Sequence, residues 1–451
     1  MTEADAPAGG PRCDGTTMAI GCASDKDRPI VSALAMHAKP RELTIAVVGY
    51  LDSPLGVGEA ARLWLRVLDA VAADVIPVSV PVPETSANHG TNPLVVPSSG
   101  TVDADVRFLC FNADEVALML HHPLVRRVKA GYTIGIWHWE TEGFPWWLRR
   151  SFRAVDEVWT ASSFSQSAIA RWTKKPVRSM PLPIPLPRAR GRRIAPIQVP
   201  ERYLFLFEFD YRSVFDRKNP LGVVKAFTRA FAPDEGPALL LKSSNQDLFP
   251  AQRDQLLKAV DGRKDVAIWD GNLSTEDNAA LMARCDAYVS LHRSEGFGLT
   301  IAEAASYGKC IITTSYSGPM EFLGSERSLL VPFSLVPVDV GHYPYPASSQ
   351  WAEPDLDEAS KQMRWAWQHQ AEARVIGAKA RAIVRDEHSI AVRAKATQET
   401  LARLDYRTAR GATSRDVNRG AARASWHAWA ALHRQSRRLI RFAEGSTCAS
   451  R

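Results

Sequence analysis

The sequence predicts an α/β fold with two parallel, doubly wound sheets that face each other across a cleft. Short apolar runs alternate with helical patterns in two successive series along the 451 residues, and a proline-rich stretch separates the series. Consecutive strand–helix units form parallel sheets covered by helices. Ligands of such sheets bind beyond the carboxyl ends of the strands, so we expect the functional residues in the loops that follow strands.

The first domain is expected at residues 41–190. Residues 1–40 are rich in Ala, Gly, Pro and Asp and show no period that would bury one face, so we expect them to be disordered. From residue 42 onward, short apolar runs are separated by helical patterns. We predict strands at 42–48, 75–82, 106–111, 132–136 and 157–160, and helices at 59–70, 145–154 and 165–173.

The domain boundary is expected at PLPIPLP (181–187) and the arginine-rich residues up to Pro196, because proline fixes φ and donates no backbone hydrogen bond. The second domain, at 198–385, repeats the alternation. Residues 386–406 are expected as a helix that can cross back to the first domain, and 407–451 as a basic amphipathic tail. Within the second domain we predict strands at 203–207, 238–243, 266–269 and 287–291, and helices at 222–231, 253–259, 275–285 after the N-cap Ser274, and 299–307.

Charge and composition exclude some classes of function. The net charge of +7 comes from residues 407–451, where ten arginines stand against Asp416 and Glu444, so residues 1–406 carry a net charge of −1. A nearly neutral body offers no track for a phosphate backbone, and we expect no nucleic-acid partner. The six cysteines show no C-x-x-C spacing, no apolar run reaches the ~18 residues of a membrane span, and residues 1–40 lack a secretory signal. We therefore expect a cytoplasmic protein with reduced thiols.

The stretch SEGFGLTIAEAASYGKC (294–310) predicts a phosphate site. Gly296 and Gly298 follow a predicted strand and let the backbone approach a ligand without obstruction from Cβ atoms. The helix that starts near Leu299 points unpaired N–H groups and the positive end of its dipole into the same space. Glu303, about one turn into the helix, can accept hydrogen bonds from ribose hydroxyls, while Glu295 reaches the other side of a diphosphate.

These residues resemble the E-x₇-E signature of the retaining glycosyltransferases of family GT4, which have the GT-B fold of two facing Rossmann-like domains. The resemblance covers residues 42–402 in element order. It implies that Glu295 contacts the donor sugar and that Glu303 binds ribose. It also implies that the backbone holds the distal phosphate at Gly296, Phe297, Gly298, Leu299 and Thr300.

A nucleoside diphosphate leaving group needs its charge neutralised by a metal or by fixed cations. The segment FDYRSVFDRKNP (209–220) offers Arg212, Arg217 and Lys218 after a strand. It is similar to the basic pair of GT4 enzymes, in which an arginine precedes a lysine by about six positions; this spacing fits Arg212 with Lys218, and Arg217 is the second candidate. The D-x-D at 103–105 precedes its predicted strand, where strand-end chemistry is not expected. We therefore predict no catalytic metal and no cofactor.

A glycine loop follows the first predicted strand, GYLDSPLGVGEAAR (49–62), and should face the cleft. It contains the pattern G-x-G-x-x-A of dinucleotide-binding loops. The loop is long, however, and no acid closes the second predicted strand for an adenine ribose. In GT4 enzymes the corresponding loop lies beside the donor phosphate and the acceptor, which implies substrate contacts for Gly56, Gly58 and Arg62.

The stretch IGIWHWETEGF (134–144) places His138 and Glu140 between tryptophans at another strand end, a setting that suits sugar binding. Together with DEVWTASSF (156–164) it resembles a subset of bacterial GT4 enzymes that modify polysaccharides. The resemblance places His138 near a histidine that touches the donor sugar in many members, although this subset often has another residue there. His292, just before Ser294, is expected at the cleft entrance.

The sequence therefore predicts a retaining, metal-independent glycosyltransferase that uses a nucleoside diphosphate sugar and a glycan or lipid-linked acceptor. The alternatives are an NAD(P)-binding oxidoreductase that uses the Gly56 loop and a non-catalytic protein that binds nucleotide sugars. The tail has the pattern of a basic helix lying on a membrane surface, which predicts peripheral attachment to anionic lipid, although a disordered or folded-back tail fits equally well. Its apolar face would comprise Trp426, Trp429, Leu432, Leu439 and Ile440, and its basic face Arg434, Arg437, Arg438 and Arg441.

Overall fold

The computed structural model describes residues 43–71, 73–82, 100–187, 197, 199, 201–339 and 341–404. The predictions made for residues 1–40, for the arginine-rich part of the domain boundary and for the tail at 407–451 lie outside the described residues. None of the helices described is long and apolar enough to cross a membrane.

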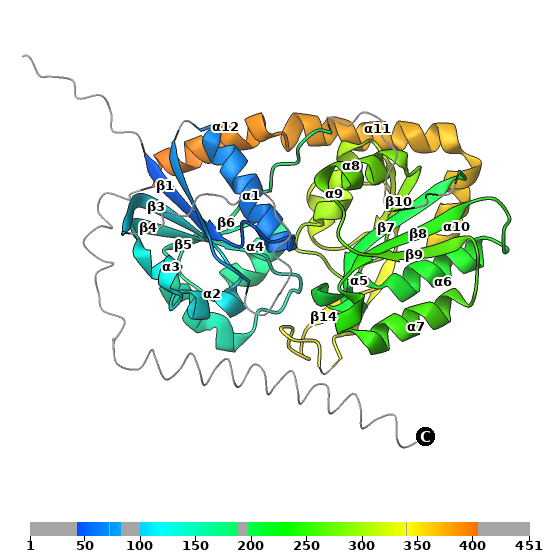
Figure 1. The fold of residues 1–451 in the computed structure, drawn as a ribbon, viewed down its shortest axis with the longest axis horizontal. Helices are drawn as coiled ribbons and strands as arrows, with labels where there is room; N and C mark the ends of the chain where they lie inside the picture. Colours follow the sequence, from blue (N-terminus) through cyan, green and yellow to red (C-terminus); the bar gives the residue numbers. More distant parts are fainter. Residues whose placement is uncertain are drawn as a thin grey trace, which may run out of the picture. The chain divides into compact units, whose positions relative to one another are not determined.

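The N-terminal lobe, residues 43–187, is built on a parallel sheet of six strands in the order β2-β1-β3-β4-β5-β6 (Figure 1). Its strand order reverses between β1 and β3. The strands are β1 (Thr44–Gly49), β2 (Asp74–Ser79), β3 (Val102–Cys110), β4 (Val128–Trp137), β5 (Glu157–Thr160) and β6 (Val177–Ser179); the helices are α1 (Gly56–Asp69), α2 (Ala113–Met119), α3 (Pro123–Arg127), the 3₁₀ helix η1 (Trp146–Ala154) and α4 (Ser163–Ala170).

The C-terminal lobe, residues 201–387, has a second parallel sheet in the order β12-β11-β10-β7-β8-β9. The order reverses between β7 and β10, so the loops after these two strands flank the expected ligand position. The strands are β7 (Leu204–Asp210), β8 (Ala238–Ser244), β9 (Val266–Asp270), β10 (Ala287–Ser290), β11 (Cys310–Thr314) and β12 (Leu329–Val331); the helices are η2 (Tyr211–Ser213), α5 (Phe215–Lys218), α6 (Pro220–Ala230), η3 (Gln246–Leu248), α7 (Pro250–Val260), α8 (Thr275–Arg284), α9 (Leu299–Ser306), η4 (Gly318–Glu321) and α10 (Leu356–Gln368).

Two features connect the lobes. An antiparallel hairpin, β13 (Phe333–Pro337) with β14 (Gln350–Pro354), extends from the C-terminal lobe, and its connecting segment packs against N-terminal aromatic residues. Helix α11 (Gln370–Glu387) packs on the C-terminal lobe, whereas α12 (Ile390–Ala402) packs on α1. At their junction His388 accepts a hydrogen bond through its carbonyl from the N–H of Ile184 at 2.7 Å, so the proline-rich segment lies against this crossover.

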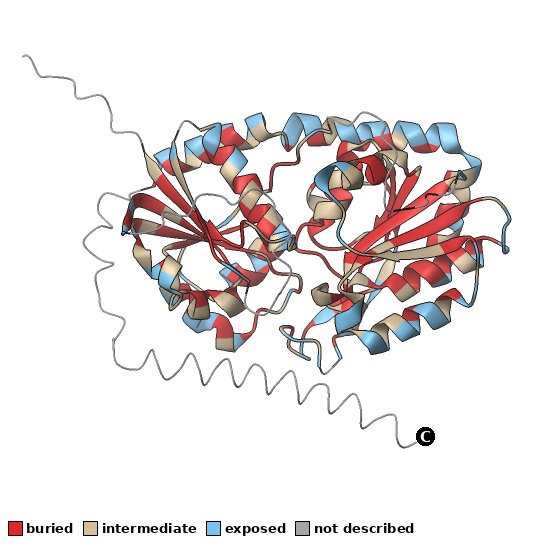
Figure 2. Cartoon of the chain, in the orientation of Figure 1, coloured by how far each residue is buried: buried red, intermediate tan, exposed pale blue. Residues whose placement is uncertain are grey.

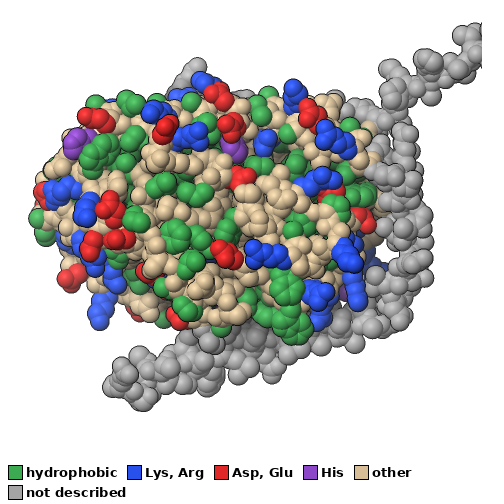
Figure 3. All heavy atoms as spheres, turned by 180° about the vertical axis from the view of Figure 1, so that it is seen from behind, with side chains coloured by type: hydrophobic (Ala, Val, Ile, Leu, Met, Phe, Trp, Pro, Cys, Tyr) green, Lys and Arg blue, Asp and Glu red, His purple; other side chains and the backbone are tan. Residues whose placement is uncertain are grey.

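The central strands of both sheets are buried on both faces, whereas the edge strands β2, β6 and β9 are partly exposed and the helices bury one side and expose the other (Figure 2). This pattern is expected for parallel sheets sandwiched between helices. Ser274 caps α8 as predicted, since its side chain accepts from the N–H of Asp277. On the face seen in Figure 3, basic and acidic side chains are interspersed.

Some local predictions were wrong. Within the predicted helix at 145–154, Trp146–Ala154 form the 3₁₀ helix η1 rather than an α-helix, although 3₁₀ runs of more than about four residues are uncommon. The D-x-D at 103–105 lies within β3 rather than before it, at the start of the strand, where the Asp105 carboxylate accepts from the N–H of Thr44 at 3.1 Å. The β13–β14 hairpin was not predicted.

Candidate active site

A cluster of one acid and two cations lies at the carboxyl ends of β7 and β10. Lys218 Nζ is 2.5 Å from Glu295 Oε1, and Arg217 Nη1 is 3.2 Å from Glu295 Oε2. All three side chains are at most 15% exposed. Lys218 and Glu295 are 77 positions apart in the sequence. They meet because the strand order reverses between β7 and β10, which brings the two loops together.

The turn that follows α5 is tied to the chain at the end of β10. Asn219 has a left-handed backbone (φ 55°) and caps α6 by accepting from the N–H of Gly222 at 3.0 Å. The Asn219 side chain also donates to the carbonyl of Leu291 at 2.8 Å, at the end of β10. Arg217 donates through Nη1 to the Ser294 carbonyl at 2.7 Å. Asparagine tolerates the left-handed region better than most residues. Asn219, which follows Arg217 and Lys218 in the sequence, can therefore adopt the backbone conformation that this turn requires.

Burial alone would raise the pKa of Glu295, but Lys218 and Arg217 lower it to about 2. Glu295 is therefore a carboxylate at neutral pH. His292 lies beside this cluster and is fully buried rather than at an entrance, with both ring nitrogens lacking a hydrogen-bond partner among the described residues. Burial lowers its pKa to about 4, so the imidazole is neutral.

The predicted glycine loop has tight packing. Gly298 has φ +89°, which favours glycine, and Gly318 packs so closely that a Cβ there would lie 2.4 Å from the Gly296 carbonyl carbon. No side chain caps α9 at Gly298, which leaves its N-terminal N–H groups for a ligand. The side chain of Phe297 packs against Phe322 and His388 and is 3% exposed. Phe297 can therefore offer a ligand its backbone but not its ring.

Glu303 lies in α9 and is half-buried, close to Glu208 of β7. Burial, then the charges of Glu208 and of Glu59 from α1, raise the Glu303 pKa to about 8. Asn278 donates to Glu303 Oε1 at 3.4 Å. Glu208 is buried and its Oε1 has no partner among the described residues. Sequence reasoning missed Glu208 because a single acid inside an aromatic strand (LFLFEFD) carries no motif.

Arg212 does not pair with Glu295. The N–H of Arg212 donates to Asp210 Oδ1 at 2.8 Å, but within the described ranges the Arg212 guanidinium forms no ion pair. The structure therefore brings Arg217, rather than Arg212, to Glu295. Thr300, in the first turn of α9, and Leu299 are half-buried.

The glycine loop of the N-terminal lobe is braced by Arg62. Arg62 Nε donates to Glu59 Oε2 at 2.8 Å, and Nη1 donates to the carbonyls of Leu51 and Ser53 at 2.9 and 2.8 Å. A Cβ at Gly58 would lie 2.5 Å from the Tyr50 carbonyl oxygen, whereas one at Gly56 would meet nothing within 4 Å. Gly58 thus permits the close approach of helix and loop, and Gly56 is open.

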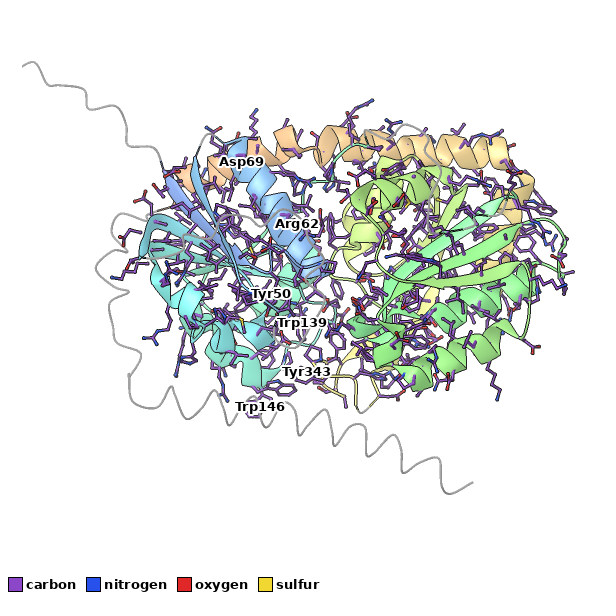
Figure 4. The ribbon with its side chains drawn as sticks, viewed as in Figure 1. Tyr50, Arg62, Asp69, Trp139, Trp146 and Tyr343 are labelled. Carbon is purple, nitrogen blue, oxygen red and sulfur yellow. The ribbon has the colours of Figure 1, made fainter. Side chains whose placement is uncertain are left out.

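The two lobes meet at the glycine loop. Ser162 Oγ donates to the Gly296 carbonyl at 2.6 Å, and Ser165 Oγ donates to the Trp139 carbonyl at 2.5 Å. The hypothetical Cβ of Gly296 would be 3.7 Å from that of His138, a half-buried residue whose pKa burial lowers to about 4. Figure 4 labels Trp139 on the side of the N-terminal lobe that makes these contacts.

Glu140 joins this contact from the N-terminal lobe. Its Oε2 accepts from the hydroxyl of Tyr345 at 3.0 Å, and its carbonyl accepts from Ser294 Oγ. Tyr345 belongs to the segment between β13 and β14 and packs edge-on against Trp139, with ring centroids 5.7 Å apart. Sequence reasoning missed Tyr345 and Ser162 because their partners lie more than 100 positions away. It also missed Ser165, although its partner Trp139 is only 26 positions away. In the part of the chain that the structure describes, no group of three or more His, Cys, Asp or Glu is arranged to hold a metal ion.

Part of the chain is similar to a known protein family. Residues 251–334, which include the glycine loop, match the family model described as glycosyl transferases group 1. No curated protein sequence matches the chain.

Solved structures give the fold. The chain is similar to sucrose-phosphate synthase from Thermosynechococcus elongatus, with a TM-score of 0.57 and 15% identity over 80% of this chain and 98% of that one. It is also similar to Anabaena HepE in complex with UDP-glucose, with a TM-score of 0.55 and 13% identity over 80% and 100% of the two chains. Pneumococcal O-GlcNAc transferase GtfA, in complex with UDP and GlcNAc, is matched at a TM-score of 0.46 and 12% identity; 66% of this chain and 56% of that chain are covered. The two sheets and the first two likenesses establish the GT-B fold.

Proposed function

We propose that the chain is a retaining glycosyltransferase that moves a sugar from a nucleoside diphosphate sugar to a hydroxyl of a glycan or lipid-linked glycan. The observation that carries this proposal is the pairing of Glu295 with Lys218 and Arg217 at the strand-order reversal, beside the uncapped start of α9. Cations and a helix N-terminus at one point suit a diphosphate. The match of residues 251–334 to glycosyl transferases group 1 supports it, and HepE, crystallised with UDP-glucose, shows that this fold can hold such a donor.

Donor binding is assigned to the C-terminal lobe. The backbone N–H groups at 296–300 hold the distal phosphate, and Glu303 accepts from ribose hydroxyls. Lys218 can turn from Glu295 towards the diphosphate because its ammonium sits on a flexible stem, whereas Arg217 is fixed by the carbonyls of Ser294 and Ser213. Since these cations can neutralise the leaving group, we propose that transfer needs no metal.

Acceptor binding is assigned to the N-terminal lobe. Gly56, Gly58 and the loop braced by Arg62 form one wall, beside both the donor phosphate and the acceptor, and Glu140 forms the other together with His138, which also comes near the donor sugar. His138 is neutral because burial lowers its pKa to about 4, so it can accept or donate a hydrogen bond to a sugar without adding charge.

The proposed reaction breaks the bond between the anomeric carbon and the phosphate oxygen and joins that carbon to the acceptor oxygen. The acceptor attacks from the face that the phosphate leaves, which retains the configuration, and its hydroxyl proton passes to a phosphate oxygen. Lys218 and Arg217 stabilise the leaving nucleoside diphosphate. The ionised Glu295 lies beside the sugar, where positive charge develops.

A nucleotide panel tests this function. Thermal unfolding is measured with UDP, GDP, ADP, dTDP and NAD. One nucleoside diphosphate should stabilise the chain by about 2.7 kcal/mol when present at about 100 times its Kd. Lys218→Met should weaken this effect, while Lys225→Met, an exposed lysine on α6, should not.

The panel also separates the alternatives. Stabilisation by NAD alone would favour an oxidoreductase and contradict the proposal. If a diphosphate binds, NMR of the product anomeric carbon then tests retention, and an inverted product would refute that part. Binding with no turnover of any donor sugar would favour a non-catalytic protein.

A further inference from the structure

One face of the N-terminal lobe combines exposed tryptophan with unpaired cations. Residues 143–187 contain seven basic side chains and two acids, Asp156 and Glu157. Glu157 is fully buried and pairs with Arg178, and Asp156 accepts from the N–H of Thr133 at 2.8 Å. Lys175 donates inward to the carbonyls of Phe152 and Val155. The remaining five cations are exposed and form no ion pair with any residue that the structure describes: Arg149, Arg150, Arg153, Arg171 and Lys174.

The 3₁₀ helix η1 presents most of this face. Leu148, Ser151 and Phe152 are buried against the lobe, whereas Trp146, Arg149, Arg150 and Arg153 are exposed. Trp146 is 68% exposed, and Figure 4 shows it pointing away from the ribbon at the edge of the lobe. A segment with apolar and basic groups on its outer side has the composition of an interfacial element rather than of a solvated surface.

One contact between a cation and a ring joins η1 to the segment after α4, and one ring pair lies within η1. The guanidinium of Arg149 lies 6.0 Å from the ring centroid of Trp172, which follows α4, and the rings of Trp146 and Trp147 are 6.1 Å apart. We call this surface the Trp–Arg face: Trp146, Trp147, Arg149, Arg150, Arg153, Arg171, Trp172 and Lys174.

Acids on the neighbouring elements do not neutralise this face. Asp114 and Glu115 on α2, which packs against η1, are half-buried. Glu142, exposed in the preceding loop, lies close enough to Tyr316 that, in addition to burial, its charge helps to raise the pKa of that hydroxyl. The outward charge is therefore positive and has no partner of opposite sign in the described residues.

We propose that the Trp–Arg face binds the surface of anionic lipid membranes. The positive charge of the face is complementary to an anionic membrane surface, which attracts each arginine near it. Tryptophan rings favour the headgroup region of a membrane, because this region is apolar on one side and hydrated on the other. The face begins at Trp146, six residues after Glu140 in the sequence. Binding is measured without nucleotide and does not depend on the proposed reaction.

Vesicle sedimentation of the full chain tests this proposal. Phosphatidylcholine vesicles with and without phosphatidylglycerol are compared at low salt and at high salt. The chain should sediment with the anionic vesicles, and high salt should weaken the binding because exposed charges are screened. Equal binding to neutral and anionic vesicles, or none to either, would overturn the proposal.

Variants locate the binding surface. Arg149→Gln with Arg150→Gln and Arg153→Gln should lower the partition coefficient about 100-fold, roughly fivefold for each arginine. The matched control changes three exposed lysines of the C-terminal lobe, Lys258→Gln with Lys264→Gln and Lys379→Gln, and should leave the coefficient within about twofold. If both triple variants lose the same factor, or if the first loses none because another part of the chain binds lipid, the proposal fails.

A single substitution gives an independent measure. Trp146→Ser should lower the partition coefficient severalfold without moving the unfolding midpoint, since the side chain is 68% exposed. Leu257→Ser, at a residue 53% exposed on α7, is its control and should change neither. If Trp146→Ser binds vesicles as well as the wild type does, the tryptophan is not part of the binding surface. If the wild type binds a soluble anionic glycan tightly and vesicles cannot displace that glycan, the partner is the glycan rather than lipid.

Discussion

The carboxyl edges of the two sheets differ in chemistry although both sheets are parallel and six-stranded. The edge of the C-terminal sheet concentrates charge, with Arg217, Lys218 and Glu295 in direct contact and Glu208 near Glu303. The edge of the N-terminal sheet offers glycines, buried tryptophans and the neutral His138. A charged diphosphate needs the first kind of surface, and an uncharged sugar acceptor suits the second.

The two lobes also differ in the hydrogen bonds that fix their loops. In the C-terminal lobe, side chains bind the loop that carries the charges, as Asn219 does at Leu291. In the N-terminal lobe, Arg62 is used on the backbone of its own loop, so its charge is not free for a ligand. Both sheets are parallel and six-stranded, but the cations in their loops are used differently: Arg62 fixes its own loop, whereas Arg217 and Lys218 pair with Glu295.

Glu295→Gln should have the largest effect and sharpens this contrast. Under the proposed function, Glu295 lies beside the reacting sugar, and removing its carboxylate should lower kcat about 10²–10³-fold. Nucleoside diphosphate affinity should hold or rise, because Lys218 and Arg217 lose their internal counter-charge. Steady-state kinetics with calorimetric binding measures both. Glu140→Gln in the N-terminal lobe should cost less, and a larger loss there would reverse the assignment of the lobes.

Close packing of glycines predicts the next largest effect. Gly318→Ala places a Cβ 2.4 Å from the Gly296 carbonyl and should lower the free energy of unfolding by about 3 kcal/mol. Gly58→Ala should behave similarly in the other lobe, where the clash is with the Tyr50 carbonyl at 2.5 Å. Gly324→Ala and Gly56→Ala, which meet nothing within 4 Å, are the controls. Denaturant unfolding that fails to separate these pairs would refute the packing described.

The pH dependence of stability tests the acid pair of the C-terminal lobe. Burial, followed by Glu208, raises the folded-state pKa of Glu303 from 4.5 to about 8. Folding therefore favours the protonated form, and this stabilisation is fully present below about pH 4.5 and is lost as pH rises through about 8. Glu303→Gln should flatten the fall in unfolding free energy between about pH 5 and about pH 9. Parallel profiles for the two proteins would show that Glu303 is not the titrating group.

Tyr345→Phe should give the smallest effect. It removes the hydrogen bond from the hydroxyl to Glu140 while keeping the ring against Trp139, so we expect a loss of about 1 kcal/mol in unfolding free energy. Chemical denaturation measures it. A loss as large as that of Gly318→Ala would mean that the contact between the lobes depends on this one bond.

The sequence predicted the strands that correspond to β1–β5 and β7–β10 because apolar periodicity is local, but it did not predict β6, β11 or β12. It also predicted the loops of Glu295 and Lys218, since glycines and cations after strands have direct chemical meaning. It could not choose Arg217 over Arg212, because both follow the same strand and only packing against β10 decides. Tyr345 lies 205 positions from Glu140, and such a contact leaves no trace in a single sequence. The prediction for Phe297 concerns its backbone, and what the sequence did not show is that its ring packs against His388 at the crossover.

The central claim is that the start of α9 and the paired cations hold a diphosphate. A crystal structure with the nucleoside diphosphate selected by the panel tests it most directly. We predict phosphate oxygens within hydrogen-bonding distance of Lys218 Nζ and of the N–H groups at 298–300. A diphosphate bound instead at the Gly56 loop, with Lys218 still on Glu295, would contradict the account.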